Sequence, residues 1–328
     1  VALMRMSIRE AINLTLDEEM ARDERVVILG EDVASDQGGV YGITAGLPEK
    51  YGIERVIDTP ITESAIIGAA GGAALTGLRP VAELMFVDFL GVCLDQLLNQ
   101  IAKFRYMFGG QARTPVVIRT MIGAGAGTGP QHSQILYPLL AAIPGIKVVV
   151  PSNAADAKGL LAEAIRQDDP VVFCEHKALY MDECDVPEGE FLIPFGQART
   201  VVEGTDITVV AISRMVIFAE QAAKQLASEG ISVEVIDPRT ISPLDEGAIL
   251  KSLAKTGRLV VVDEANPICS MAAEIASIAA ERGFDYLDAP IKKVTAPHTP
   301  VPATPCLEAH YVPSVDNIVT AIKATLDY

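Results

Sequence analysis

The protein has 328 residues, of which 50% are hydrophobic, with a formal net charge of −17 and a pI near 4.6. This length is long for one domain and sufficient for two, each with its own core. The basic residues are scattered, which argues against binding to nucleic acid or to an anionic membrane, because phosphate binding needs concentrated Lys and Arg. An acidic surface instead suits a basic protein partner.

Short β-branched runs alternate with helical patterns through the first half of the chain. Strands are predicted at 25–30, 79–86, 114–121, 146–152 and 170–176, and the main helices at 91–106 and 154–167. Because these strands are apolar on both faces and alternate with helices, they predict a parallel sheet that is covered on both sides.

Residues 181–200, MDECDVPEGEFLIPFGQART, interrupt this rhythm with acids, prolines and glycines, and we expect a connection between domains there. A second α/β series follows. Its strands are predicted in 206–213, 231–240, 257–265 and 291–295, and its helices at 217–228, at 245–255, after Ser270 and from Val315. The sequence therefore predicts an α/β protein with two parallel-sheet domains, residues 1–185 and 186–328.

The cysteines and the apolar stretches bear on the compartment. Five cysteines without CxxC spacing are typical of reduced thiols in an intracellular protein. The first residues, VALMRMSIREAINLTL, become charged too soon for a secretory signal peptide. The longest uncharged apolar stretch, 65–78, is too short to span a bilayer. We therefore expect a cytoplasmic protein without a membrane segment.

One acidic residue, Glu63, precedes a run of small residues in DTPITESAIIGAAGGAALTG, residues 58–77. An acid beside a helix N-terminus usually only interacts favourably with the helix dipole or takes part in the cap. From the local pattern alone, that interpretation is preferred. In the functional alternative, the carboxylate makes a charge-assisted hydrogen bond to a basic ring nitrogen of a cofactor. The small residues behind it would let such a ring approach the helix backbone.

His132 lies in a second candidate segment, the glycine-rich stretch GAGAGTGPQHSQ. A histidine in a turn is the plain alternative, but active sites of α/β proteins collect on loops beyond the carboxyl ends of parallel strands, so we favour a functional role. The glycine spacing matches neither a dinucleotide fingerprint nor a P-loop, and a phosphate cradle is only weakly indicated. For Glu31 and Asp32 in GEDV, a polar exit from a strand is at least as good an interpretation as proton transfer.

A series of motifs now indicates a family. GEDV, DTPITES, GLRPVAELMFVDF, QHSQ, DAKGLL, DPVVFCEHKALY, IDPRTISPLD and TGRLVVVDEA occur in the same order and spacing as in the β subunits of thiamine-diphosphate-dependent 2-oxo acid dehydrogenase E1 components. The chain resembles this family over essentially its whole length. The resemblance implies a transketolase-like pyrimidine-binding domain followed by a transketolase C-terminal-like domain.

Within the family, the chain most resembles the acetoin dehydrogenase branch. The stretches that carry this likeness are ELMFVDFLGVCLDQLLNQIAKFRYMFGG, VIRTMIGAG, DEANPICSMA and VTAPHTPVP. Three stretches depart from the usual pattern: PSNAADAKG in place of a Thr-Pro-Tyr run, Ser213 in place of a glycine, and GTGP before Gln131.

The resemblance implies roles for four residues. Glu63 matches the glutamate that hydrogen-bonds N1′ of the thiamine aminopyrimidine, a bond that prepares the cofactor to lose its C2 proton. Phe89 matches the aromatic residue that stacks on the pyrimidine, and Met85 lines the same pocket. His132 matches the histidine implicated in proton transfer and in passing the acyl group to a lipoyl arm.

The sequence lacks one element that the cofactor needs. Thiamine diphosphate is normally held through Mg²⁺ by a GDG segment with a later Asn, and no GDG occurs here. We therefore expect an α subunit that holds the Mg²⁺ and the diphosphate, with the cofactor at the interface of an α2β2 heterotetramer. The resemblance further implies E2 dihydrolipoamide acetyltransferase as a partner, with E3 in the complex.

The family also often carries a monovalent cation, usually K⁺, in the first domain of this subunit. By position, the ligands would be the main chain of Val116, Ala164, Ile165 and Gln167 together with Asp169. The alternative is an ordinary turn from a helix to a strand at AIRQDDP.

The resemblance implies the β half of an E1 component that cleaves acetoin oxidatively, releases acetaldehyde and passes an acetyl group to lipoyl-E2. One alternative is the same chemistry on pyruvate or a branched-chain 2-oxo acid. A second is a non-catalytic α/β scaffold subunit, for which Glu63 would be dispensable. A third, a single-chain transketolase-like enzyme, is disfavoured by the missing GDG segment.

Overall fold

The computed structural model describes residues 2–328, which divide into two compact units. The first unit runs to Ile122 and resumes over Leu139–Phe195, and the second comprises Gly123–Pro138 and Gly196–Tyr328. Compared with the predicted division at residue 185, the segment 123–138 packs with the second unit, and residues 186–195 pack with the first.

The first unit is built on a parallel sheet. Its strand order is β6 (Lys147–Val149), β7 (Val171–His176), β5 (Val117–Ile122), β4 (Arg79–Phe86), β2 (Val26–Gly30) and β3 (Val56–Asp58). Every residue of β2, β5 and β7 is buried, as expected for a parallel sheet with both faces covered. The five strands predicted from apolar runs are therefore confirmed.

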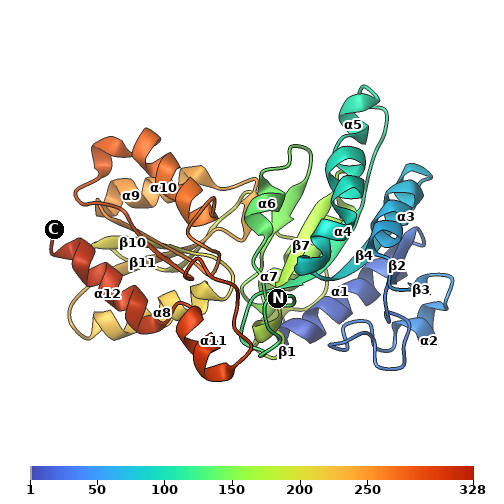
Figure 1. Cartoon of the computed structure of the whole chain (residues 1–328), viewed down its shortest axis with the longest axis horizontal. Helices are drawn as coiled ribbons and strands as arrows, with labels where there is room; N and C mark the ends of the chain where they lie inside the picture. Colours follow the sequence, from blue (N-terminus) through green and yellow to red (C-terminus); the bar gives the residue numbers. More distant parts are fainter. Residues whose placement is uncertain (1) are drawn as a thin grey trace. The chain divides into compact units, whose positions relative to one another are not determined.

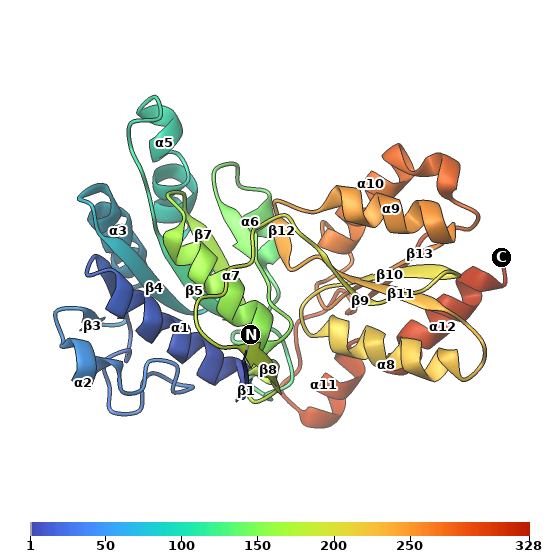
Figure 2. The ribbon, with the colours of Figure 1, turned by 180° about the vertical axis from the view of Figure 1, so that it is seen from behind.

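Helices cover both faces of this sheet (Figures 1 and 2). On one face α1 (Ile8–Arg22) packs against α7 (Ala154–Arg166), and on the other α3 (Glu63–Leu75) packs on β4 and α4 (Leu90–Asp95). The unit also contains α2 (Leu47–Tyr51), α5 (Phe104–Met107) and the single turns η1 (Val87–Phe89) and η3 (Lys177–Leu179). The helix α6 (Tyr137–Ala141) begins in the second unit and ends in the first.

The helix predicted at 91–106 is not continuous. Cys93 has non-helical dihedral angles within α4, and a π-helical segment, η2 (Gln96–Ile101), separates α4 from α5. The predicted connection at 181–200 also contains structure, because β8 (Glu183–Pro187) pairs with β1 (Leu3–Ser7) as an antiparallel ribbon.

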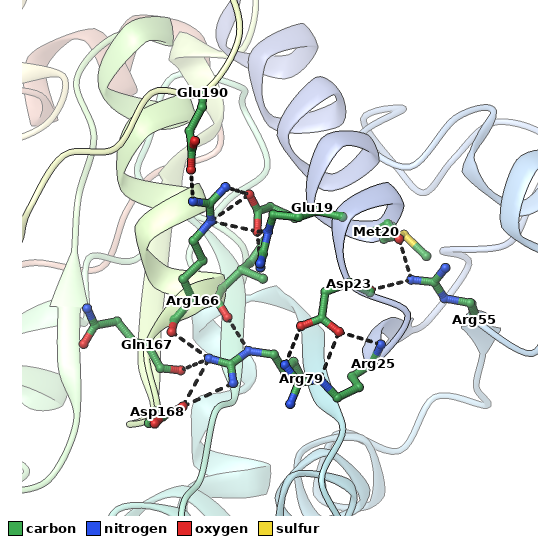
Figure 3. Close-up of polar contacts among 12 residues, drawn as sticks. Glu19, Met20, Asp23, Arg25, Arg55, Arg79, Arg166, Gln167, Asp168 and Glu190 are labelled. Atoms are coloured by element: carbon green, nitrogen blue, oxygen red, sulfur yellow. Dashed lines mark hydrogen bonds and ion pairs between the residues drawn. The ribbon is translucent and has the colours of Figure 1, made fainter.

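Ion pairs fix α1 in place within the first unit (Figure 3). Its start is a capping box between Ser7 and Glu10. Glu19 is buried and pairs with Arg166 of α7 at 2.7 Å. At the helix end, the Arg55 guanidinium donates to the Met20 and Asp23 carbonyls, at 2.9 and 3.1 Å, and so satisfies acceptors that a helix C-terminus leaves without an internal donor.

The second unit has its own sheet, in the order β14 (Lys292–Thr295), β13 (Leu259–Asp263), β10 (Ile207–Ala211), β11 (Val233–Asp237) and β9 (Arg199–Val202). Only β9 is antiparallel to its neighbour. Helices α8 (Met215–Ala227) and α12 (Val315–Leu326) cover one face, and α9 (Glu246–Thr256) and α10 (Met271–Arg282) cover the other (Figure 2). The unit also contains β12 (Thr240–Ser242), η4 (Phe284–Tyr286) and α11 (Pro305–Tyr311).

The strand order of the second unit creates a topological switch point. From β10 the chain passes to β11 on one side and then returns to β13 on the other. In open α/β sheets, ligands bind in the crevice outside the carboxyl ends of strands that flank such a point. Over residues 2–328, no helix is both long and apolar enough to cross a membrane.

A matched pair of glycines tests the packing of the first unit. Gly145 and Gly77 have similar positive φ angles, 104° and 101°, but a Cβ on Gly145 would lie 2.0 Å from the Ala102 carbonyl oxygen, whereas a Cβ on Gly77 meets nothing within 4 Å. We expect Gly77→Ala to lower the free energy of unfolding by about 1 kcal/mol and Gly145→Ala by about 3 kcal/mol or more. Urea denaturation of both variants measures the difference, and equal losses would contradict the steric argument.

Candidate functional site

Glu63 is the first residue of α3, and its side chain is half-buried. Thr62, the residue before it, makes no side-chain cap of the helix. Because Glu63 stands in the first turn, its negative charge is favoured by the helix dipole. The outward face of α3 carries only small residues over its first three turns, namely Ala65, Gly68, Ala69 and Gly72, all of which are exposed.

The negative charge of Glu63 contributes to a raised pKa in two other titratable groups. Burial raises the pKa of the Cys93 thiol to about 12, and the negative charge of Glu63 adds to this rise. Burial also raises the pKa of Glu31, with further contributions from the charges of Asp32 and Glu63. The acids of GEDV and DTPITES, which lie apart in the sequence, therefore act on each other electrostatically.

The aromatic and thioether candidates follow the same strand end. Met85 and Phe89 are both half-buried, and the Phe89 ring meets the Phe86 ring edge to face, with centroids 5.8 Å apart. Cys93 Sγ lies 3.9 Å from the Phe89 carbonyl oxygen, so α4 links Phe89 to the surroundings of Glu63. Glu63, Met85 and Phe89 thus belong to one unit, at the start of α3 and the carboxyl end of β4.

A buried ion network lies on the same sheet, and its role was not predicted from the sequence. The Arg119 guanidinium donates to both oxygens of Glu175 at 2.7 Å and to Glu83 at 2.8 Å. Tyr180 donates its hydroxyl to Glu175 at 2.6 Å. These four residues, with Met85 among others, line a cavity of about 10 Å³, which is room for about one water molecule.

The Arg119 network places buried charges within the sheet, around the small cavity that Met85 also lines. Burial raises the pKa of Glu83, although the Arg119 cation opposes the rise. Because all three side chains are buried, removing Arg119 would leave both carboxylates, Glu83 and Glu175, without a charge partner. The three strands β4, β5 and β7 each contribute one of these side chains, which is why no local motif reveals the network.

His132 lies in the second unit, in the half-buried part of the segment 123–138. Its backbone N–H donates to the Gly129 carbonyl at 3.3 Å, and its own carbonyl accepts the Thr128 hydroxyl at 3.2 Å. The structure therefore brings Glu63, Met85 and Phe89 into one unit, while His132 is held by the other.

Three backbone N–H groups of the glycine-rich loop donate to carboxylates of the chain and are not available to a phosphate. The N–H of Ala124 donates to Glu264 at 2.7 Å, and the N–H of Gly125 donates to Glu308 at 2.8 Å. The N–H of Gly127 reaches both oxygens of Glu308, at 3.3 and 3.2 Å. Both carboxylates are buried, so the chain itself supplies the anions that this loop binds.

The turn expected to hold K⁺ already carries a positive charge (Figure 3). The carbonyl oxygens of Ile165 and Gln167 accept hydrogen bonds from Arg79, at 2.9 and 2.8 Å. The Val116 carbonyl accepts the Val171 N–H at 2.9 Å.

The other two expected ligands of that cation also have partners. The Ala164 carbonyl accepts the Gln167 N–H at 3.3 Å, and the Asp169 carboxylate pairs with Arg105 at 2.5 Å and with Lys147 at 3.7 Å. Each carbonyl keeps a second lone pair, and oxygen ligands suit a hard cation. The turn therefore has the right donor atoms for K⁺, beside three cationic side chains.

Comparison with known proteins agrees with this architecture. Residues 4–183 match the family Transketolase, pyrimidine binding domain, and residues 196–318 match Transketolase, C-terminal domain. The acetoin:2,6-dichlorophenolindophenol oxidoreductase subunit beta of Cupriavidus necator is 53% identical over 98% of each chain. The mitochondrial pyruvate dehydrogenase E1 component subunit beta-2 of Oryza sativa is 47% identical over 98% of this chain and 86% of its own.

A solved structure described as a split gene transketolase, inactive beta4 tetramer, is similar with a TM-score of 0.79. It covers 98% of each chain at 24% identity and shows the fold alone.

These matches define an α/β protein of the transketolase class, with a pyrimidine-binding domain and a C-terminal domain. Within that class, the chain belongs to the family of E1 β subunits that includes the acetoin oxidoreductase and pyruvate dehydrogenase β subunits. The predicted fold class and the predicted family are therefore confirmed.

The Arg119 network can be tested against an exposed ion pair. Arg119→Met leaves Glu83 and Glu175 buried without their cation, and we expect the free energy of unfolding to fall by about 3–5 kcal/mol. The control is Arg5→Met, which removes the exposed pair with Glu183 and costs about 0–1 kcal/mol. Chemical denaturation measures both losses, and a loss of less than about 1 kcal/mol for Arg119→Met would refute the importance of the network.

Proposed function

We propose that this chain is the β subunit of a thiamine-diphosphate-dependent E1 component that cleaves acetoin oxidatively and passes the acetyl group to a lipoyl group on E2. The observation that carries the proposal is the placement of Glu63 at the start of α3, beside the segment that holds Met85 and Phe89. The identity of 53% to a relative named for acetoin favours that substrate.

The residues present fit the aminopyrimidine of the cofactor. Glu63 supplies a carboxylate acceptor at a helix N-terminus, and Phe89 and Met85 supply apolar surface beside it. The exposed small residues of α3 leave its backbone accessible to a flat ring. When bound, thiamine diphosphate supplies a nucleophilic carbon that adds to the carbonyl group of the substrate.

The site residues of this chain then have separate roles. Glu63 accepts the hydrogen bond of the pyrimidine N1′ and holds the proton there. Phe89 and Met85 orient the ring and exclude water from it. His132 moves a proton at the reacting end and assists transfer of the acetyl group to the lipoyl arm.

Exposed apolar surface in the first unit supports an α subunit as the partner. Tyr106, Met107 and Phe108 at the end of α5 are 88%, 63% and 51% exposed. Contiguous exposed apolar surface marks an interaction site. We assign to the α subunit the Mg²⁺ and the diphosphate half of the cofactor in an α2β2 heterotetramer. In terms of sequence, we assign residues 1–185 to the pyrimidine-binding domain and residues 186–328 to the C-terminal domain, with the segment 123–138 packed in the second unit and residues 186–195 in the first.

Three further assignments follow from the family and stay predictions. E3 completes the dehydrogenase complex with E2, and the complex is cytoplasmic. K⁺ would bind at the oxygens of Val116, Ala164, Ile165, Gln167 and Asp169, where it adds to the positive charge of Arg79.

Co-expression with the α subunit tests the substrate. We expect acetoin-dependent dye reduction by the purified heterotetramer to exceed that with pyruvate or a branched-chain 2-oxo acid. The opposite order would favour the pyruvate or branched-chain alternative. The relative that is 47% identical is named as a pyruvate dehydrogenase subunit.

Replacing Glu63 with Gln keeps the side-chain shape but exchanges an anionic acceptor for a neutral amide. Loss of such a charge-assisted bond costs about 3 kcal/mol or more in the transition state, so we expect H/D exchange at C2 of the bound cofactor to slow by about a hundredfold or more. NMR after acid quench measures this exchange, and the exposed Glu54→Gln is the matched control. Unchanged exchange in Glu63→Gln would support the scaffold alternative.

The split cofactor site predicts how the isolated chain behaves. Without an α subunit it lacks the diphosphate half of the site, so calorimetry should show only weak binding of thiamine diphosphate with Mg²⁺. Adding the α subunit should restore tight binding. Tight, Mg²⁺-dependent binding to this chain alone would overturn the split-site proposal.

The charge of −17 predicts how the E1 component meets E2. A basic docking domain of E2 is attracted by an acidic surface, and salt screens that attraction over about 10 Å at 0.1 M. We expect the association rate constant, measured by surface plasmon resonance, to fall as NaCl rises from 20 to 300 mM, by roughly tenfold or more. A rate independent of salt would exclude electrostatic steering.

A further inference from the structure

The switch-point crevice of the second unit is filled by the chain itself. At the carboxyl end of β13, Glu264 accepts the N–H of Ala124, and Asp263 accepts the hydroxyl of Tyr137. Beyond β10, Arg214 donates to the Ala124 carbonyl at 3.3 Å. The position where such a sheet ordinarily binds a ligand therefore holds the two ends of the segment 123–138, which carries His132.

Alternating glycines give this segment its shape. Gly123, Gly125, Gly127 and Gly129 have φ angles of 89°, 111°, 65° and 76°. Alternation of ordinary and left-handed backbone turns successive N–H groups toward one side and forms a concave anion site, and glycine is the residue that adopts it without strain. Here the anions are the side chains of Glu264 and Glu308.

Hydrogen bonds carry this constraint from the glycines to His132. The Gly123 N–H donates to the Gln134 carbonyl at 3.1 Å and closes the base of the loop. Thr128, next to Gly127, hydrogen-bonds the His132 carbonyl at 3.2 Å and the Ser133 hydroxyl at 2.9 Å. The backbone of His132 is therefore connected to the glycines that Glu308 holds.

We propose that Glu308, together with Glu264, is a positioning residue that fixes the loop from which His132 acts. Glu308 comes from α11 and touches no reacting group in this proposal, and its effect on catalysis passes through the loop. The inference deepens the proposed function, because it rests on the role of His132 there.

The chemistry of Glu308 makes a sharp variant available. Its carboxylate accepts from Gly125 and Gly127, and both of its oxygens are used. Glu308→Gln replaces one acceptor oxygen with an NH₂ group, which would face a backbone N–H with no acceptor between them. Since Glu308 is only 6% exposed as a residue, water cannot readily take the place of the lost acceptor.

Amide hydrogen exchange of the full chain tests whether Glu308 holds the loop at 123–138, without reference to activity. We expect peptides covering 123–138 to exchange about tenfold faster or more in Glu308→Gln than in the parent, while peptides from the first unit stay unchanged. Glu220→Gln, the same substitution at an exposed site on α8, is the matched control. Unchanged exchange in 123–138 would overturn the proposal.

A double-mutant cycle in the α2β2 enzyme tests whether Glu308 acts through His132. We expect Glu308→Gln to lower kcat for acetoin-dependent dye reduction by about ten- to a hundredfold, with C2 exchange of the cofactor unaffected. In the His132→Ala background the same substitution should have no further effect on kcat. An equal loss of kcat in both backgrounds would show a merely structural role and refute the proposal.

Two outcomes separate this inference from the proposed function. If His132→Ala keeps full activity, the role of His132 in the proposed function fails, and exchange in 123–138 alone decides whether Glu308 clamps the loop. If Glu308→Gln does not fold, Gly125→Ala perturbs the same contact from the other side, because φ at this position is 111°. Gly125→Ala should then give the same faster exchange and the same non-additivity with His132→Ala.

Discussion

The central strands of both sheets are buried on both faces, and this constraint decides where chemistry occurs in the molecule. Side chains within β2, β5, β10 and β13 contact helices or neighbouring strands, not solvent. Polar groups therefore act where strands end. Glu31 follows β2, Phe89 follows β4, and Glu264 follows β13. The Arg119 network is one exception, and it is tolerated because its charges compensate one another inside the sheet.

Strands were predictable where burial imposes a continuous apolar run. The run at 79–86 coincides with β4, and the helix predicted at 154–167 ends one residue earlier as α7. The prediction of one continuous helix at 91–106 was wrong because a π-helical segment interrupts it, although Leu97 and Ile101 within that segment are buried as in a regular helix. Hydrophobic spacing alone does not distinguish a continuous helix from one divided in this way.

The candidate site was predictable only in part. Glu63, Met85 and Phe89 lie in motifs whose order and spacing indicate the family of E1 β subunits, and the structure places them in one unit. Glu264 and Glu308 accept hydrogen bonds from backbone N–H groups that are 140 and 183 residues away in sequence. Every residue except proline has such an N–H group, so residue types do not reveal these contacts. For the same reason the glycine pattern by itself also suits a phosphate cradle: the sequence indicates the N–H donors of the loop but not the carboxylates that accept from them.

The path of the chain between the two units limits how the protein can be divided. The chain passes from the first unit to the second after Ile122, returns at Leu139, and passes over again after Phe195. No single cut yields two intact halves. A gene fragment ending near residue 185 would encode the glycine loop without its carboxylates, and the complementary fragment would encode a crevice without its loop. Recombination that exchanges either half between relatives must therefore preserve the match between the loop at 123–138 and the acids at 263, 264 and 308.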